Sequence, residues 1–168
     1  DAFFAEDIAE TGDPQFRRAL TALLDRVPAI RDARRKLEEL RHLRSEKLIW
    51  RYVDSQVLGR IFVITGKVKN GYDHPRGFVQ LTGKLFTKGK NLANTHTVYA
   101  GNLISDMDLV NLSADELKKR LNNRFGNNRM NSRVQPGKAL PFMVVFTQLP
   151  EAQLEEFTIE VDASTALK

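Results

Sequence analysis

The chain has 168 residues, of which 42% are hydrophobic and 28% are charged, and its formal net charge at pH 7 is +5. These proportions are typical of one soluble globular domain with an ordinary core, and they exclude a disordered or fibrous chain. The absence of cysteine excludes disulfides, thiol catalysis and cysteine-bound zinc within the chain. The longest apolar run, residues 139–146, is the size of a strand and far shorter than the ~20 residues of a membrane helix.

The positive charge lies mainly in two stretches of the chain. Residues 26–51 hold nine Lys and Arg against four acids, and residues 67–138 hold thirteen against five, whereas the end of the chain is acidic. The basic residues are interspersed with acids and never form a run longer than three. We therefore favour a solvated basic surface over a nucleic-acid site, and contact with anionic lipid is a further alternative.

The N-terminal part of the chain predicts helices. Residues 1–12 show no clear period, but Asp13 followed by Pro14 is a favourable helix start. The residues after it form one apolar stripe at helical spacing: Phe16, Leu20, Leu23, Leu24 and Val27. The segment 29–47 also repeats apolar residues at helical spacing and is either a second amphipathic helix or a mobile charged arm. Residues 1–46 are therefore expected to form a helical stalk or appendage.

From Lys47 onward, the pattern changes to that of strands. Short runs rich in β-branched and aromatic residues, separated by turns, predict strands at residues 47–53, 60–70, 78–86, 92–101, 142–149 and 157–163. Six such strands without βαβ alternation or a glycine-rich phosphate loop predict a mainly β fold with helical additions, a β-sandwich over residues 47–165. Gly66 and Gly83, inside two of these strands, mark either bulges or close approaches.

One helix is expected among the strands, at about residues 113–125. Ser113 and Glu116 form a capping box, and Leu117, Leu121 and Phe125 form an apolar stripe that would pack on the sheet. Gly126 is suited to the position after the last helical turn.

No residues in the sequence form a convincing catalytic or metal-binding group. The three histidines lie in different segments without ligand spacing, and no nucleophile motif is present. Asp106 and Asp108 could serve as metal ligands or an acid–base pair, but we favour a turn before the helix. We therefore predict that the protein is not an enzyme and has no catalytic residue, metal or cofactor.

Aromatic residues occur at several strand positions, and an unusual group of amide and guanidinium side chains follows the predicted helix. Trp50, Tyr52, Phe62 and Phe78 are interpreted as core residues. Side chains of Asn and Arg could bind a glycan, a phosphate or a peptide backbone, although filling a loop is the simpler interpretation. Together with the turn at residues 71–77, they give a candidate contact surface: Asn123, Asn127, Asn128, Arg129, Asn131, Arg133, His74 and Arg76.

Several motifs occur in order between residues 60 and 161: RIFVITGKVKN, PRGFVQLTGKLF, VYAGNLIS, RFGN, VQPGKALPFMVVF and LEEFTIEV. In these motifs the chain resembles a bacterial family catalogued only as a domain of unknown function, number 3426. The resemblance covers roughly residues 47–163. It implies an immunoglobulin-like sandwich at the C-terminal end of a longer protein, in which a cytoplasmic cysteine zinc ribbon and one membrane helix precede the domain. Neither the zinc ribbon nor the membrane helix is in this chain, and the family has no catalytic residues to transfer.

The function that follows from these expectations is non-catalytic. We expect a binding or scaffolding module in the extracytoplasmic part of a membrane-anchored bacterial protein, facing the periplasm. Its expected partner is another protein of the cell envelope, and its attachment to the membrane would be through a segment absent from this chain. A basic nucleic-acid-binding accessory domain and a glycan- or cell-wall-binding module remain as alternatives.

Overall fold

The computed structural model describes residues 14–24 and 26–168, and the chain divides into two compact units, residues 1–38 and 39–168. Helix α2 (Pro14–Leu24) is formed as predicted, and α3 (Pro28–His42) corresponds to the helical one of the two alternatives for residues 29–47. Pro14 opens α2 because its fixed φ suits the first helical position and its missing N–H would have no partner there. Residues 1–12 and the predicted cap Asp13 lie outside the described residues.

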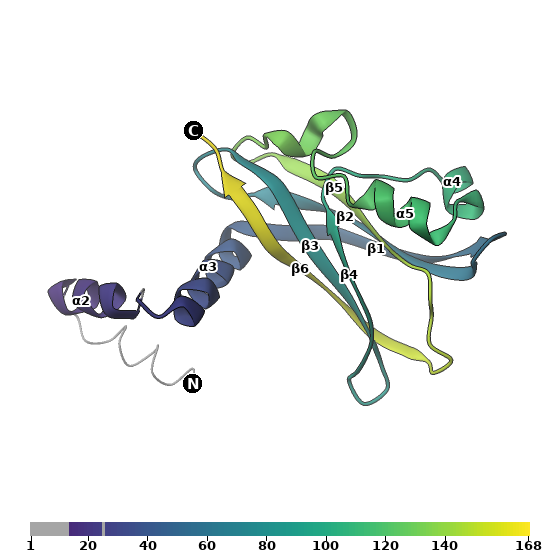
Figure 1. The fold of residues 1–168 in the computed structure, drawn as a ribbon, viewed down its shortest axis with the longest axis horizontal. Coiled ribbons are helices and arrows are strands. Elements are labelled where there is room, and N and C mark those ends of the chain that lie inside the picture. The colour runs from purple at the N-terminus through teal and green to yellow at the C-terminus, as the bar shows by residue number, and fades with distance from the viewer. Residues whose placement is uncertain (1–13, 25) are drawn as a thin grey trace. The chain divides into compact units, whose positions relative to one another are not determined.

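Strands dominate the second unit, and the prediction of a mainly β protein is confirmed. The six strands are β1 (Leu43–Ser55), β2 (Gly59–Asn70), β3 (Arg76–Thr87), β4 (Asn91–Tyr99), β5 (Ala139–Phe146) and β6 (Leu154–Ala166) (Figure 1). β1 begins at Leu43, within the segment for which a helix or a charged arm was expected.

The strands form two antiparallel sheets of three strands each, ordered β1-β2-β5 and β4-β3-β6. Neighbours in the chain form the hairpins β1–β2 and β3–β4, whereas β5 and β6 return to pair with β2 and β3. Residues with positive φ accompany two register shifts, at Lys47 in β1 and at Phe78 in β3. These are β-bulges, which increase the local twist of the strand.

The core lies between the two sheets and consists mainly of aliphatic residues with Phe142 and Phe146. Gly83 of β3 allows the sheets to approach, because a Cβ there would lie 3.0 Å from Val144 Cγ1. A Cβ on Gly66 would lie 2.8 Å from both Leu48 and Phe142 side-chain atoms. Of the two interpretations of these glycines, close approach therefore applies at both positions.

The helical insertion between β4 and β5 differs in part from the prediction. Residues expected to form a turn are the short helix α4 (Asp106–Asn111), which Ser105 caps. The capping box of Ser113 and Glu116 is confirmed, but α5 (Ala114–Leu121) ends four residues earlier than predicted. The amide of Asn122 donates to the carbonyl of Lys118, and Asn123 Oδ1 accepts from the N–H of Phe125. Such local side-chain bonds compete with further helical hydrogen bonds.

Candidate functional site

The predicted contact residues lie on two loops that the fold brings together. The turn at residues 71–77 meets the segment after α5 through a β-bridge between Arg76 and Val134. Asn70 joins both parts, since its Nδ2 donates to the carbonyls of His74 and Val134. The segment after α5 contains the kinked 3₁₀ helix η1 (Asn127–Ser132).

His74 and Arg76 are engaged in local contacts of the turn. Arg76 is 8% exposed, and its guanidinium donates to the hydroxyl and carbonyl of Ser164 at 2.8 and 3.1 Å. It also lies 4.4 Å from the centre of the Tyr72 ring. His74 Nδ1 is 2.9 Å from an Asp73 oxygen, and this contact lowers the pKa of the Asp73 carboxyl below its usual value. Both side chains therefore stabilise the turn.

Asn131 must be removed from the predicted contact surface. It is completely buried, and its side-chain amide bonds the N–H and the carbonyl of Val79 at 2.9 and 3.0 Å. Such a two-bond pairing imitates a neighbouring strand and leaves no part of the side chain at the surface. In sequence, Asn131 was indistinguishable from the exposed asparagines around it.

The remaining predicted residues of the loop are exposed. Asn127 Nδ2 donates to the carbonyl of Leu103, and Arg133 donates to the carbonyl of Lys168. Asn128 and Arg129 both have positive φ, near 55° and 58°. Arg129 also lies 4.7 Å from the centre of the Phe125 ring. Much of this surface is thus used to hold the loop together.

Asp106 and Asp108 are engaged in ion pairs with arginines. The Asp106 carboxylate is 2.5 Å from Arg51 of β1, and the Asp108 carboxylate is 2.8 Å from Arg120 of α5. The pairs tie α4 to its neighbours on either side, so these carboxylates have a structural role, although in a short helix and not in the expected turn.

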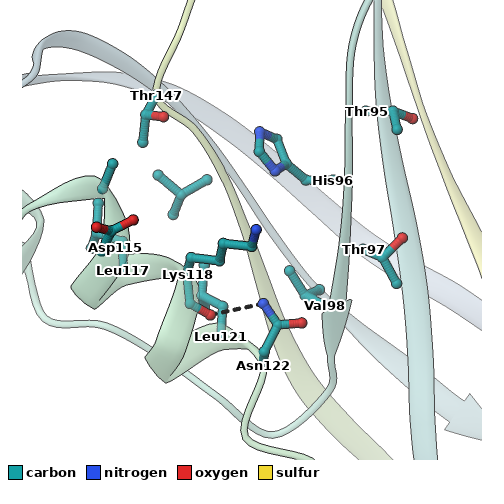
Figure 2. A pocket seen from close by; sticks show the side chains of 12 residues that line it. Thr95, His96, Thr97, Val98, Asp115, Leu117, Lys118, Leu121, Asn122 and Thr147 are labelled. Atoms are coloured by element: carbon teal, nitrogen blue, oxygen red, sulfur yellow. Dashed lines mark hydrogen bonds between the residues drawn. The ribbon is translucent and has the colours of Figure 1, made fainter.

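A cleft lies between α5 and strands β4 and β5, with a volume of about 390 Å³. Figure 2 shows the ring of His96 and the side chain of Lys118 turned toward the same space, whereas Thr95 and Thr97 point away from it. Thr97 instead lies within hydrogen-bond distance of Thr82 on the outer face of the sheet. The walls of the cleft thus carry few groups that could act together on a ligand.

His96 is one of three titratable residues that line this cleft, together with Asp115 and Lys118. Its ring packs edge-to-face on Phe146, with 5.1 Å between the ring centres. Burial lowers the pKa of His96 below its usual value, and the positive charge of Lys118 lowers it further. The neutral imidazole is therefore the favoured form, and no metal-ligand group of three or more His, Asp or Glu residues exists among the described residues.

A second surface feature is the seam between β1 and β6, which are edge strands of different sheets. In the described chain, β1 pairs only with β2, and β6 pairs only with β3. Both strands have 13 residues, and the edge of each that faces the seam is not paired in a sheet, although parts of the two strands lie within 8 Å of each other. We call the space between these two edges the β1–β6 seam.

Two hollows lie in the β1–β6 seam. The larger, about 410 Å³, is lined by Leu43, Arg44, Ser45, Ile159 and Val161. The smaller, about 160 Å³, is called the Trp50 hollow and is lined by Trp50, Tyr52, Phe62, Leu85, Leu154, Glu155, Glu156 and Phe157. Side chains of both strands thus leave uncovered space along the line where the sheets part.

The aromatic side chains of β1 are more exposed than the sequence suggested. Trp50 is 54% exposed and Tyr52 is 44% exposed, although both were interpreted as core residues. Of the four aromatic residues given that interpretation, only Phe62 is buried. Trp50 stacks on Phe62 at 5.7 Å, and Tyr52 meets Phe62 edge-to-face at 5.2 Å. Their outer surfaces stay exposed because β6 belongs to the other sheet and does not pair with β1.

Comparisons with known proteins leave the family open, because no family model, no curated protein and no solved structure matches the chain. None of the helices in the described part of the chain is long and apolar enough to cross a membrane.

Proposed function

We propose that this chain is a non-catalytic binding module that holds an extended segment of another protein along the β1–β6 seam. The module belongs, in this proposal, to the extracytoplasmic part of a membrane-anchored bacterial protein, as the resemblance to family 3426 implies. Its partner is a protein of the cell envelope.

The observation that carries the proposal is the pair of long, unpaired strand edges with hollows between them. An unpaired edge offers a row of backbone N–H and C=O groups to which another strand can bond. Hollows beside it offer space for alternate side chains of that strand, which is how strand addition becomes specific.

The exposed apolar residues of β1 add to this support. Trp50 and Tyr52, on one face of β1, are 54% and 44% exposed, and Ile49, on the opposite face of the same strand, is 65% exposed. Tryptophan and tyrosine are enriched where protein interfaces gain most of their binding energy. Exposed apolar side chains on an edge strand also favour association with another chain.

An immunoglobulin-like build, proposed for the sandwich, is consistent with the same location. The orders β1-β2-β5 and β4-β3-β6 match the A-B-E and C′-C-F orders of that fold. The position beside strand F belongs to strand G in an immunoglobulin domain, and here that position is the seam beside β6. An added segment would therefore complete the sheet.

Site-specific photo-crosslinking in cells that produce the protein tests this proposal. A photoreactive residue at position 49 of β1 is compared with one at position 92 of β4, where Leu92 is also exposed, at 56%. We expect a discrete crosslinked protein from position 49 and none from position 92. The crosslink should disappear in the double variant Trp50→Ala, Tyr52→Ala.

The crosslinked site on the partner is then mapped by mass spectrometry. A short extended segment supports strand addition. Crosslinks of equal yield from positions 49 and 92, or no crosslink from position 49, would contradict the proposal. Enzymatic turnover of a substrate at a rate that seam variants do not change would also contradict it.

A further inference from the structure

The Trp50 hollow has aromatic walls and an acidic rim. Trp50, Tyr52, Phe62 and Phe157 contribute rings, and the centres of the Phe62 and Phe157 rings are 6.1 Å apart. Glu155 and Glu156 line the same hollow from β6 and are exposed. The faces of aromatic rings carry partial negative charge and attract cations. Rings and carboxylates therefore favour the same kind of occupant, a positively charged group.

The protein itself already places one cation against this aromatic cluster. The guanidinium of Arg60 lies 5.4 Å from the centre of the Tyr52 ring and 3.4 Å from an Asp54 oxygen. This contact combines an aromatic face with a carboxylate, as the Trp50 hollow does. By contrast, the side-chain carboxylates of Glu155 and Glu156 have no hydrogen-bond or ion-pair partner within the part of the chain that the structure describes.

The segment that contains β6 is acidic, and two of its acids, Glu155 and Glu156, line the hollow. No Lys or Arg occurs between Lys138 and Lys168, whereas this stretch contains five acids: Glu151, Glu155, Glu156, Glu160 and Asp162. In a chain whose net charge is +5, β6 is thus a local acidic edge. Antiparallel pairing of β6 with a second copy of itself would bring these acids together, which disfavours a dimer through this edge.

The size of the hollow indicates what kind of cation it can hold. About 160 Å³ is below the roughly 300–1,000 Å³ of sites that enclose a small-molecule ligand. It is suited to the end of one side chain. An apolar side chain in the hollow would displace water from two carboxylates and offer them no hydrogen bond or charge in return. This loss of hydration costs free energy.

We propose that the Trp50 hollow binds an arginine or lysine side chain of the segment that lies in the β1–β6 seam. This proposal rests on the proposed function for the presence of that segment and adds its chemistry. The cationic head group lies between the exposed face of Trp50 and the carboxylates of Glu155 and Glu156, and its methylene groups cover Phe157 and Leu154. The partner is therefore an extended segment with a basic residue at the position facing Trp50.

The single tryptophan of the chain gives a direct assay, since all tryptophan fluorescence comes from Trp50. The probe is a heptapeptide with one central arginine flanked by valines and threonines. The matched control peptide has citrulline, an uncharged side chain of nearly the same shape, in place of arginine. We expect saturable changes in Trp50 fluorescence and a Kd for the arginine peptide at least about tenfold lower than for the control, the factor that combined cation–π and carboxylate contacts can supply.

A double variant isolates the role of the carboxylates. Glu155→Gln with Glu156→Gln should reduce the preference for arginine over citrulline to about threefold or less, the part that aromatic rings alone supply. Because both positions are exposed, this variant should unfold at the same urea concentration as the wild type. High salt should weaken binding of the arginine peptide more than binding of the control.

Equal affinity for the arginine and citrulline peptides, or an unchanged preference in the double variant, would overturn the inference. Absence of any fluorescence response to the arginine peptide would also overturn it. The outcomes are separable from those of the proposed function. A preference for arginine without a crosslink from position 49 would support the cation site and contradict the proposed protein partner. A crosslink from position 49 without that preference would support the partner and contradict the cation site.

Discussion

At the scale of single residues, His96 couples the stability of the domain to pH. Its pKa is lowered in the folded protein by burial and by Lys118, so the unfolded chain binds the proton more readily. The stability that comes from the neutral imidazole is complete above the unfolded pKa of about 6.5 and is lost as the pH falls through the lower folded pKa. Because the folded pKa is below the unfolded pKa, the domain loses stability as the pH falls.

We expect the free energy of unfolding of the wild type to fall from pH 7.5 to pH 5.5 by more than that of His96→Gln, measured by urea denaturation. In Lys118→Met, the pKa of His96 from NMR titration should rise, because a nearby positive charge is removed. Equal pH dependence of the wild type and His96→Gln would contradict this account of His96.

Asn131 illustrates a structural role that sequence could not separate from a surface role. Replacement by Ala removes two buried hydrogen bonds. It leaves the N–H of Val79 without its partner, whereas the Val79 carbonyl still accepts from the N–H of Ala100. We expect Asn131→Ala to lower the free energy of unfolding by about 2–4 kcal/mol. Asn127→Ala, which removes one exposed hydrogen bond, should cost less than about 1 kcal/mol. Similar costs for the two variants in urea denaturation would show that burial is not what distinguishes these residues.

At the scale of elements, Gly83 sets how closely the sheets pack. A Cβ at this position would crowd Val144, Phe146 and Ile159, at 3.0 to 3.3 Å. We expect Gly83→Ala to destabilise the domain by about 1–3 kcal/mol, the usual cost of overpacking. Lys84→Ala, at the next position of β3, faces the other way and should change stability by less than about 1 kcal/mol. A neutral Gly83→Ala in thermal or urea unfolding would mean that the sheets can move apart without cost.

The elements themselves were largely predictable, because their signals are local. Alternating apolar residues such as Phe157, Ile159 and Val161 indicate a strand wherever it lies in a sheet, and the capping box of Ser113 specifies a helix start. The end of α5 was not predictable, because Asn122 and Asn123 bond the backbone in a way that residue type alone does not determine. Residues 106–111 were likewise too short a segment for helical periodicity to be visible.

At the scale of the whole molecule, the candidate site depends on contacts between distant segments. β1 and β6 are separated by roughly a hundred residues, and no local pattern indicates that both are edge strands on the same side of the domain. Trp50 therefore has the sequence pattern of a core residue but is exposed in the fold. The acidic end of the chain was visible in the sequence, but its relation to an aromatic hollow arises only from strand order.

The distribution of charge also bears on the alternative partners. A nucleic acid would avoid the acidic edge of β6, and it would bind to basic residues elsewhere, with an affinity that falls steeply with salt. The Asn and Arg loop, which supported the glycan-binding alternative, is used in large part to hold itself to its neighbours. The seam is the surface at which unpaired backbone, exposed aromatic rings and local charge coincide.

Backbone amide exchange along β6 tests the central claim most directly. In the free domain, amides of β6 that face β3 should exchange slowly, and those that face the seam should exchange quickly. When the crosslinked partner segment occupies the seam, the account predicts that the seam-facing amides of β6 become protected while those of β4 do not change. Protection confined to β4 or to the loops, with β6 unaltered, would contradict it.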